Sequence, residues 1–112
     1  MKRGDIYRYT NINATGSIQS GNRPVIIVQN DVGNKFSPTT IVCPLSCKCD
    51  KQLPTHCLIR KSGGLKYDSI ALCEQITTVN KSDLTEYIGT VTNPITLKWL
   101  SKCLKISLGI EE

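Results

Sequence analysis

The sequence has few aromatic residues, a single histidine and no long hydrophobic run, and these shortages exclude several classes of protein. No stretch approaches the roughly 20 consecutive apolar residues that a membrane-spanning helix requires. Met1, Lys2 and Arg3 are not followed by an apolar segment, so the amino terminus does not resemble a signal peptide. We therefore expect a cytoplasmic protein without a membrane partner.

The sequence also lacks the groups that several catalytic mechanisms need. Because His56 is the only histidine, one chain cannot supply a pair of histidines for acid–base catalysis. Neighbouring residues of a strand point to opposite faces, so His56 is not expected to activate Cys57 as a nucleophile. A structural or surface role for His56 is favoured. Phosphate-binding loops with the patterns GxxxxGK[ST] and GxGxxG are absent from the sequence.

A metal centre and other cofactors are not expected. The nine acidic residues are scattered along the sequence, unlike the carboxylate cluster of a two-metal nuclease. Cys43, Cys47 and Cys49, with His56 downstream, provide soft ligands, but only half of a typical zinc site is present, so zinc is the weaker interpretation. In a reducing cytoplasm, the six cysteines are expected to be free thiols that pack as small apolar side chains.

Positive charge is in excess and is unevenly distributed. The 112 residues include 14 Lys and Arg and 9 Asp and Glu, which gives a formal charge of +5. Residues 1–66 hold ten basic and three acidic side chains (+7), whereas residues 67–112 hold four basic and six acidic ones (−2). A chain of this length is expected to form one domain, residues 1–112. The basic first half predicts an anionic partner, with nucleic acid favoured over a membrane surface.

Apolar and β-branched runs predict several short strands separated by polar loops. Residues 11–22 and 30–38 are predicted to be exposed loops, and long loops in compact domains are often binding loops. After a turn at 62–64, we expect a long strand. The predicted strands are 5–10, 24–29, 40–45, 55–60 and 69–79.

The end of the sequence changes to a helical period. Asn93 and Pro94 suit the N-cap and first position of a helix, which is predicted to end near Gly109. Four leucines recur at intervals of three and four along this segment, which makes it amphipathic. Residues 81–90 are ambiguous between a short helix and a strand. The order of elements predicts a mainly β (α+β) fold, a small antiparallel barrel closed by a C-terminal helix.

Arg23 stands where the first polar loop changes into a strand stiffened by Pro24. A rigid strand entrance suits a guanidinium that binds phosphate through two hydrogen bonds, although a solvated arginine at a loop end is the alternative. RNA carries its own nucleophile, the 2′-hydroxyl. A protein that cuts RNA therefore needs only to align the strand, stabilise the charged transition state and assist proton transfer. An arginine and a hydroxyl side chain suffice for this, and DNA would be left intact.

Short motifs in a fixed order resemble the MazF/PemK family of bacterial toxins, and they cover nearly the whole sequence. The motifs are KRGDIY at 2–7, GSIQSGNRPV at 16–25, QNDVGN at 29–34, SPT at 37–39, LPTH at 53–56 and LCEQI at 72–76. The resemblance implies a homodimer of SH3-like antiparallel β-barrels with short helices. It also implies an mRNA interferase, a metal-independent endoribonuclease that cuts single-stranded mRNA at short sequences and arrests growth. The products would carry a 2′,3′-cyclic phosphate and a 5′-hydroxyl.

The same resemblance implies a partner and assigns site residues. The partner is a MazE-like antitoxin, whose acidic segment occupies the RNA groove. The catalytic arginine falls on Arg23, and its hydroxyl partner, commonly threonine in the family, falls on Ser46. Serine keeps the hydroxyl but lacks the methyl group that restricts χ1. Phe36 either stacks on a base or anchors its loop. The implied RNA-binding residues are Ser17, Gln19, Asn34, Lys35, Phe36 and Gln75.

Two other functions are compatible with this fold. CcdB-type relatives poison DNA gyrase without cutting RNA, and a barrel that only binds RNA or protein is the other alternative. Arg23 followed by the strand-end hydroxyl of Ser46 favours the endoribonuclease. Trp99 and the leucines of the last helix are predicted to pack either on the chain's own barrel or on a second copy.

Overall fold

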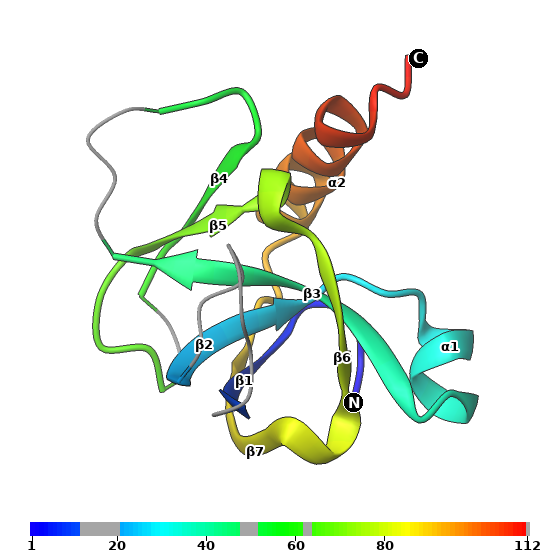
Figure 1. The fold of residues 1–112 in the computed structure, drawn as a ribbon. Helices are drawn as coiled ribbons and strands as arrows, with labels where there is room; N and C mark the ends of the chain where they lie inside the picture. Colours follow the sequence, from blue (N-terminus) through cyan, green and yellow to red (C-terminus); the bar gives the residue numbers. More distant parts are fainter. Residues whose placement is uncertain (12–20, 48–51, 62–63, 112) are drawn as a thin grey trace.

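The computed structural model describes residues 1–11, 21–47, 52–61 and 64–111, which form a curved antiparallel sheet with helices at its margins (Figure 1). The strands are β1 (Asp5–Asn11), β2 (Gly21–Ile27), β3 (Thr39–Ser46), β4 (His56–Ile59), β5 (Ser69–Leu72), β6 (Thr77–Asn80) and β7 (Leu84–Thr90). The helices are α1 (Asp31–Phe36), α2 (Pro94–Leu108) and two short 3-10 helices, η1 (Cys73–Gln75) and η2 (Lys81–Asp83). Within the described ranges, none of the helices is long and apolar enough to cross a bilayer.

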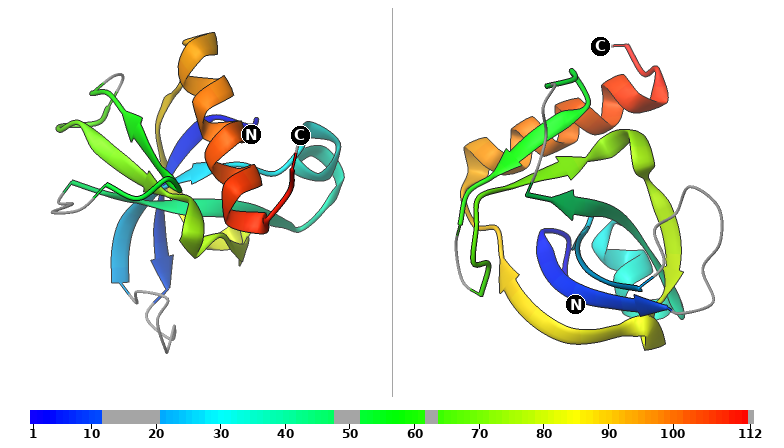
Figure 2. Two further views of the ribbon diagram at one scale, coloured as in Figure 1. Left: turned by 90° about the horizontal axis from the view of Figure 1, so that it is seen from above. Right: turned by 60° about the vertical axis from the view of Figure 1, so that its left-hand side comes forward.

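The strands pair in the order β4-β5-β3-β2-β1-β7, and every pair is antiparallel. β6 pairs with the first half of β3, and β5 pairs with its last two residues. Figure 2 shows how strongly the strands curve and how α2 lies across one end of them. In the part of the chain that is described, the strand ladder stays open, because no pairing joins β4 to β7. The expected mainly β fold with a C-terminal helix is confirmed.

The central strands bury both of their faces. Ile26 and Cys43 contribute to the larger core cluster, which also includes Leu100 and Cys103 of α2. Their neighbours in sequence point the other way, into a smaller cluster of Tyr9, Val25, Ile27, Val42 and Val79. This alternation follows from the two-residue period of a strand. It gives β2 and β3 a rigid setting between two apolar layers.

The helix α2 begins and ends at the predicted residues. The Asn93 side chain accepts a hydrogen bond from the backbone N–H of Ile95 at 2.9 Å, and Pro94 occupies the first turn. Gly109 ends the helix with a φ of 70°, a left-handed conformation that favours glycine. Leu100 packs on the chain's own sheet, whereas Leu108 is 63% exposed and Trp99 is 40% exposed.

The prediction of an exposed loop at 30–38 is wrong, because Asp31–Phe36 form α1. The Asn30 side chain caps this helix by accepting a hydrogen bond from the backbone N–H of Gly33 at 2.8 Å. Asn34 is only 4% exposed. Its side chain donates to the Gln29 carbonyl at 2.9 Å and accepts from the Thr40 hydroxyl at 2.7 Å. The polar composition that suggests a loop therefore serves to cap and anchor a short helix.

The predicted long strand at 69–79 is also wrong, because η1 divides it into β5 and β6. Leu45 pairs with Ala71 of β5, whereas Val42 pairs with Thr77 of β6. The two strands thus lie along different halves of β3, and η1 forms the corner between them. The ambiguous segment 81–90 contains both expected elements, a short helical turn (η2) followed by β7.

Four of the cysteines pack in the core as small apolar side chains, as expected. Cys43, Cys57, Cys73 and Cys103 are buried free thiols, and Cys47 is an exposed one. Burial raises the pKa of Cys57 to about 12 and that of Cys103 to about 11. These two thiols are therefore protonated and unreactive at neutral pH. Cys49 lies outside the described residues.

Candidate active site

The pairing of β2 with β3 brings Arg23 and Ser46 together. This pairing ends with Val25 opposite Pro44, and Arg23 and Ser46 each lie two residues beyond that last pair. Both side chains line one cavity of about 490 Å³. We call this space the larger cavity, because the other cavity that Arg23 lines is smaller.

The Arg23 guanidinium has hydrogen-bonding capacity that the described part of the chain does not use. Its Nη1 atom is buried and has no hydrogen-bond partner within the described part of the chain. Burial also lowers the pKa of the guanidinium below its ordinary value. A buried donor left without an acceptor destabilises a fold by about 1–3 kcal/mol. An arginine held in this way is suited to bind an anion, which supplies the missing acceptor.

A second, smaller cavity of about 210 Å³ lies on the other side of Arg23. Its apolar wall comes from the smaller core cluster, including Tyr9, Val25 and Val42. Its polar end is formed by Glu74 and Gln75 of η1. Arg23 lines both cavities, so the predicted RNA-contacting residue Gln75 lies in the same neighbourhood as the predicted catalytic arginine.

The carboxylate of Glu74 is fixed by hydrogen bonds from β4 and the residue before it. His56 Nε2 lies 3.0 Å from Glu74 Oε2, and the Thr55 hydroxyl donates to Oε1 at 3.1 Å. Burial by itself would raise the pKa of Glu74, but hydrogen bonds from its own backbone N–H, His56 and Thr55 outweigh burial and lower the pKa. His56 lines neither cavity and holds η1 against β4, which agrees with a structural role.

The predicted residues of α1 lie apart from Arg23. Asn34 is buried, and its side chain is engaged by Gln29 and Thr40. Phe36 is 75% exposed, and the Lys35 ammonium lies 5.3 Å from the centre of its ring. α1 follows the end of β2 that is remote from Arg23 (Figure 1). None of these three side chains lines either cavity. Ser17 and Gln19 lie outside the described residues.

The larger cavity contains polar residues that the sequence analysis did not identify. They come from β1, from the start of β2, from the segment before β5 and from the first residue of β5. Alternation along β1 could have placed Arg8 on a face, but only the pairing of Arg8 with Pro24 shows that this face borders Arg23. The additional polar residues are Arg8, Asn22, Lys66, Tyr67 and Ser69.

The residues that could bind a metal do not assemble into a site in the described ranges. No group of three or more histidine, cysteine or acidic side chains there has the geometry to hold a metal ion. Cys43 is buried, whereas Cys47 is exposed at the end of β3. The side chains that line the cavities with Arg23 include the hydroxyl of Ser46 and the hydrogen-bonding groups of Glu74 and Gln75.

Comparison with known proteins assigns the chain to a family. A family model described as PemK-like, MazF-like toxin of type II toxin-antitoxin system matches residues 2–108. The chain is 42% identical over 112 residues to Endoribonuclease EndoA of Bacillus subtilis, covering 98% of this chain and 96% of the relative. It is 43% identical over 112 residues to Endoribonuclease MazF of Staphylococcus saprophyticus, covering 98% and 92%. The chain belongs to the family of PemK-like and MazF-like toxins.

A solved structure shows the same fold. The fold is similar to an endoribonuclease in complex with its cognate antitoxin from a mycobacterial species, with a TM-score of 0.76 and 25% identity. The similarity covers 100% of this chain and 96% of the other. The curved antiparallel sheet with a C-terminal helix is therefore the fold of this toxin family.

Proposed function

We propose that the chain is a sequence-specific endoribonuclease toxin that cuts single-stranded mRNA. Arg23 and Ser46 carry out the cleavage, without a metal ion. The observation that carries this proposal is the buried Arg23 Nη1, which lacks a partner in the described structure. Arg23 lines both cavities, and it shares the larger one with Ser46. Both curated relatives are named endoribonucleases, which supports the same activity.

The reaction uses the nucleophile that RNA itself provides. The 2′-oxygen attacks the adjacent phosphorus, the bond from phosphorus to the 5′-oxygen breaks, and the 2′-proton is transferred to the departing oxygen. The products are a 2′,3′-cyclic phosphate and a 5′-hydroxyl. Arg23 stabilises the negative charge of the pentacoordinate transition state, because its buried N–H groups are already in place before charge develops. The Ser46 hydroxyl hydrogen-bonds the phosphate or the reacting oxygens.

RNA would reach this site along the basic first half of the chain. Gln75 contacts the nucleotide that enters the smaller cavity, which it lines together with Arg23. Lys35 and the exposed Phe36 ring offer a more distant contact, and Ser17 and Gln19 are retained as contacts from the first loop. Asn34 supports this path indirectly by holding α1 in place through its buried side chain.

The natural inhibitor would be a MazE-like antitoxin with an acidic segment. The chain has a formal charge of +5, and a phosphate chain and an acidic peptide can compete for one basic surface. The similar solved structure is of an endoribonuclease with its cognate antitoxin. Such a toxin, released from its antitoxin, would act on mRNA in the cytoplasm and arrest growth.

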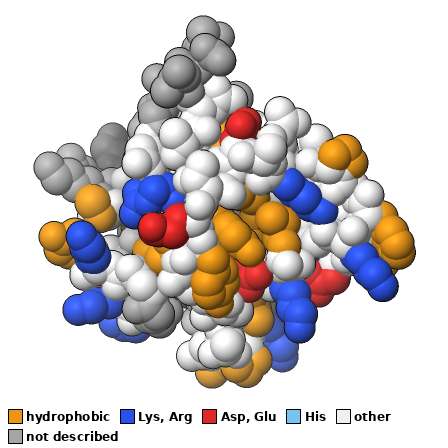
Figure 3. All heavy atoms as spheres, turned by 90° about the horizontal axis from the view of Figure 1, so that it is seen from below, with side chains coloured by type: hydrophobic (Ala, Val, Ile, Leu, Met, Phe, Trp, Pro, Cys, Tyr) orange, Lys and Arg blue, Asp and Glu red, His pale blue; other side chains and the backbone are white. Residues whose placement is uncertain are grey.

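The active form would be a homodimer. Trp99 is 40% exposed and Leu108 is 63% exposed on α2, while the other side of the helix packs on the sheet. Figure 3 shows a further group of hydrophobic side chains on the face of the molecule that lies below in Figure 1. Sedimentation at micromolar concentration is expected to give twice the mass of one chain, and a monomer would contradict the dimer.

Incubation of the purified protein with single-stranded RNA in EDTA tests the proposed function. Cleavage is expected to persist, and the new ends should be a 2′,3′-cyclic phosphate and a 5′-hydroxyl. Single-stranded DNA of the same sequence should remain intact because it lacks the 2′-hydroxyl. Intact RNA together with trapped gyrase–DNA complexes would support the non-enzymatic alternative. RNA that is retained but not cut would indicate a binding protein.

A further inference from the structure

The larger cavity carries more positive charge than cleavage by Arg23 and Ser46 requires. Three cationic side chains line it, Arg8, Arg23 and Lys66, and no acidic side chain does so among the residues that the structure describes. The lining also includes hydroxyl and amide side chains and four aliphatic residues. The aliphatic lining residues are Pro24, Leu45, Leu65 and Ile88. A space with cations around an apolar surface suits a ligand that is anionic at its ends and flat and apolar in between.

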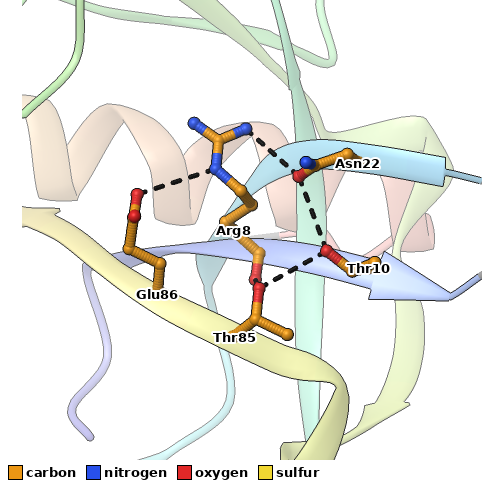
Figure 4. Close-up of polar contacts among 5 residues, drawn as sticks. All are labelled: Arg8, Thr10, Asn22, Thr85 and Glu86. Atoms are coloured by element: carbon orange, nitrogen blue, oxygen red, sulfur yellow. Dashed lines mark hydrogen bonds and ion pairs between the residues drawn. The ribbon is translucent and has the colours of Figure 1, made fainter.

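Arg8 is held in one orientation with part of its guanidinium unused. Its Nε lies 3.6 Å from Glu86 Oε1, and its Nη1 donates to Asn22 Oδ1 at 3.2 Å. Figure 4 shows that the remaining terminal nitrogen is directed away from both partners. Because the pair with Glu86 is exposed, it adds little to stability, and its effect is to orient the guanidinium. An oriented guanidinium is suited to bind phosphate through two hydrogen bonds.

Tyr67 presents an aromatic ring from a backbone that is fixed at several points. The Ser69 hydroxyl donates to the Tyr67 carbonyl at 3.2 Å, and the backbone N–H of Lys61 donates to Asp68 at 2.6 Å. The backbone N–H of Gly64 donates to the Ile88 carbonyl at 2.9 Å, which ties the same segment to β7. The Tyr67 side chain is nevertheless 67% exposed beside the cavity. An exposed ring carried by an anchored backbone segment provides a stacking surface.

We propose that the larger cavity binds one nucleotide next to the cut, with its base stacked on Tyr67 and its outer phosphate held by Arg8. This inference rests on the proposed function, because Arg23 must hold the scissile phosphate on one side of the bound nucleotide while Arg8 holds the phosphate on its other side. Single-stranded RNA is recognised through bases that stack on aromatic side chains and phosphates that bind cations. A volume of about 490 Å³ lies within the range of small-ligand sites.

The apolar lining and the ring favour RNA over an acidic peptide as the ligand of this cavity. A peptide of Asp and Glu would use the three cations but would leave Tyr67 and the apolar wall without a partner. A nucleotide uses both, since every base has an aromatic face. Tyr67 is therefore assigned to substrate binding and Arg8 to the phosphate backbone, in addition to the residues already placed at the site.

The test is an abasic scan of a short RNA that the protein cuts once. Each nucleotide around the cut is replaced in turn by an abasic ribonucleotide, which keeps the phosphate and the 2′-hydroxyl. At one position beside the cut, loss of the base should lower kcat/KM by roughly fivefold to 150-fold, the range expected for one stacked base. Tyr67→Ala should cause a similar loss with the intact RNA and no further loss with the RNA that is abasic at that position. Tyr67→Phe should behave like the unsubstituted protein.

The contribution of Arg8 is measured by salt dependence with RNA that carries a 2′-deoxyribose at the cut, so that it binds without being cleaved. Arg8→Gln should reduce the slope of log affinity against log salt by about 0.7, the value for one phosphate contact to a single strand. Lys98→Gln is the matched control, because Lys98 lies on α2 and lines neither cavity beside Arg23. It should leave the slope unchanged. Thermal unfolding of each variant confirms that it is folded.

The outcomes separate this inference from the proposed function. If the unsubstituted protein does not cut RNA, the proposed function fails and the nucleotide subsite fails with it. If the unsubstituted protein cuts RNA but Tyr67→Ala lowers kcat/KM by the same factor with every abasic substrate, only the subsite is overturned. Polyglutamate could instead compete with RNA equally well for the unsubstituted protein and for Tyr67→Ala. If, in addition, no single abasic position lowered kcat/KM more than the others, the cavity would be a peptide site and the subsite would also be overturned.

Discussion

Arg23 combines features that favour a reaction and oppose stability. Its guanidinium is partly buried, its pKa is lowered by burial, and its Nη1 has no acceptor in the described structure. A fold gains nothing from an unpaired buried donor. Such an arrangement is expected where a protein holds a charged group ready for a ligand, because the transition state then meets donors that need no reorganisation.

Replacement of Arg23 should therefore separate activity from stability. Arg23→Met fills a similar volume without a charge, and we expect its free energy of unfolding to stay equal to that of the unsubstituted protein or to rise by about 1 kcal/mol. Its kcat on single-stranded RNA should fall by at least roughly 100-fold, as for the loss of a donor to a developing negative charge. Chemical denaturation and cleavage assays measure the two effects. A large loss of stability would show that Arg23 serves the fold.

Ser46 allows a finer test at the same scale. Ser46→Thr adds the methyl group that restricts χ1, so kcat should rise by roughly twofold to fivefold, through a smaller loss of side-chain entropy in the transition state. Ser46→Ala removes the hydroxyl, and kcat should fall by roughly tenfold to 100-fold, the effect of one hydrogen bond to a charged group. Single-turnover cleavage is the measurement. An unchanged rate in Ser46→Ala would exclude the hydroxyl from the reaction.

Ionisation of Glu74, which lines the smaller cavity, makes the stability of the fold depend on pH. Its pKa in the folded chain is lower than the ordinary 4.5, so ionised Glu74 stabilises the fold above about pH 4.5. That contribution should disappear as the pH falls through the lower, folded-state pKa. The thermal midpoint of Glu74→Gln should therefore fall less steeply between pH 5 and pH 3. Glu111→Gln removes an exposed carboxylate near the chain end, and an equal flattening in that control would contradict the assignment.

Some elements around the site contribute residues to the two cavities, and others hold those elements in place. β2 and β3 bring Arg23 and Ser46 to the larger cavity, and η1 places Glu74 and Gln75 in the smaller cavity. α1 and α2 contribute no residue to either cavity beside Arg23. α2 packs against β4 and η1, so it supports the corner on which Gln75 lies.

The anchoring of α1 gives a prediction at the scale of elements. Asn34→Ala leaves the Gln29 carbonyl and the Thr40 hydroxyl without their partner, and should lower the free energy of unfolding by about 1–3 kcal/mol. Lys35→Ala, at the exposed neighbouring position, is the control and should change it by less than about 0.5 kcal/mol. Urea denaturation measures both. Equal stabilities would mean that α1 is not anchored through Asn34.

The whole molecule is basic, and its charge is concentrated where the site lies. The three cations of the larger cavity, Arg8, Arg23 and Lys66, all belong to residues 1–66, which hold the formal +7. The remaining residues are net acidic and include β5, β6, β7 and α2. A field of this sign raises the local concentration of a polyanion and accelerates its association.

RNA binding should therefore depend strongly on ionic strength. For RNA made uncleavable by a 2′-deoxyribose at the cut, we expect log affinity to fall linearly with log salt, with a slope of about −0.7 for each phosphate bound. Contacts from Arg8, Arg23 and Lys66 give a slope near −2 from the larger cavity alone. Fluorescence anisotropy between 50 and 300 mM salt is suitable. A slope near zero would show that the positive charge does not contribute to binding.

Local sequence signals were sufficient for elements whose ends are defined by neighbouring residues. The N-cap at Asn93, Pro94 and the left-handed Gly109 define α2 without reference to the sheet. The strand through Val25 and Ile27 follows equally from a continuous apolar run. By contrast, α1 depends on Asn34 bonding to Gln29 and Thr40, and the break at η1 depends on how β3 divides its length between two partners. Sequence neighbours alone do not reveal these contacts.

Composition, hydrophobic period and ordered motifs are properties of the chain that need no folding to be recognised. They were enough to predict a basic, mainly β protein of a toxin family and to assign catalytic roles to Arg23 and Ser46 by resemblance. That Arg23 lines two cavities, and that Arg8 and Tyr67 line one of them, became visible only in the folded chain. The reason is geometric, because a curved antiparallel sheet brings together residues separated by tens of positions, and strand register fixes which of them meet.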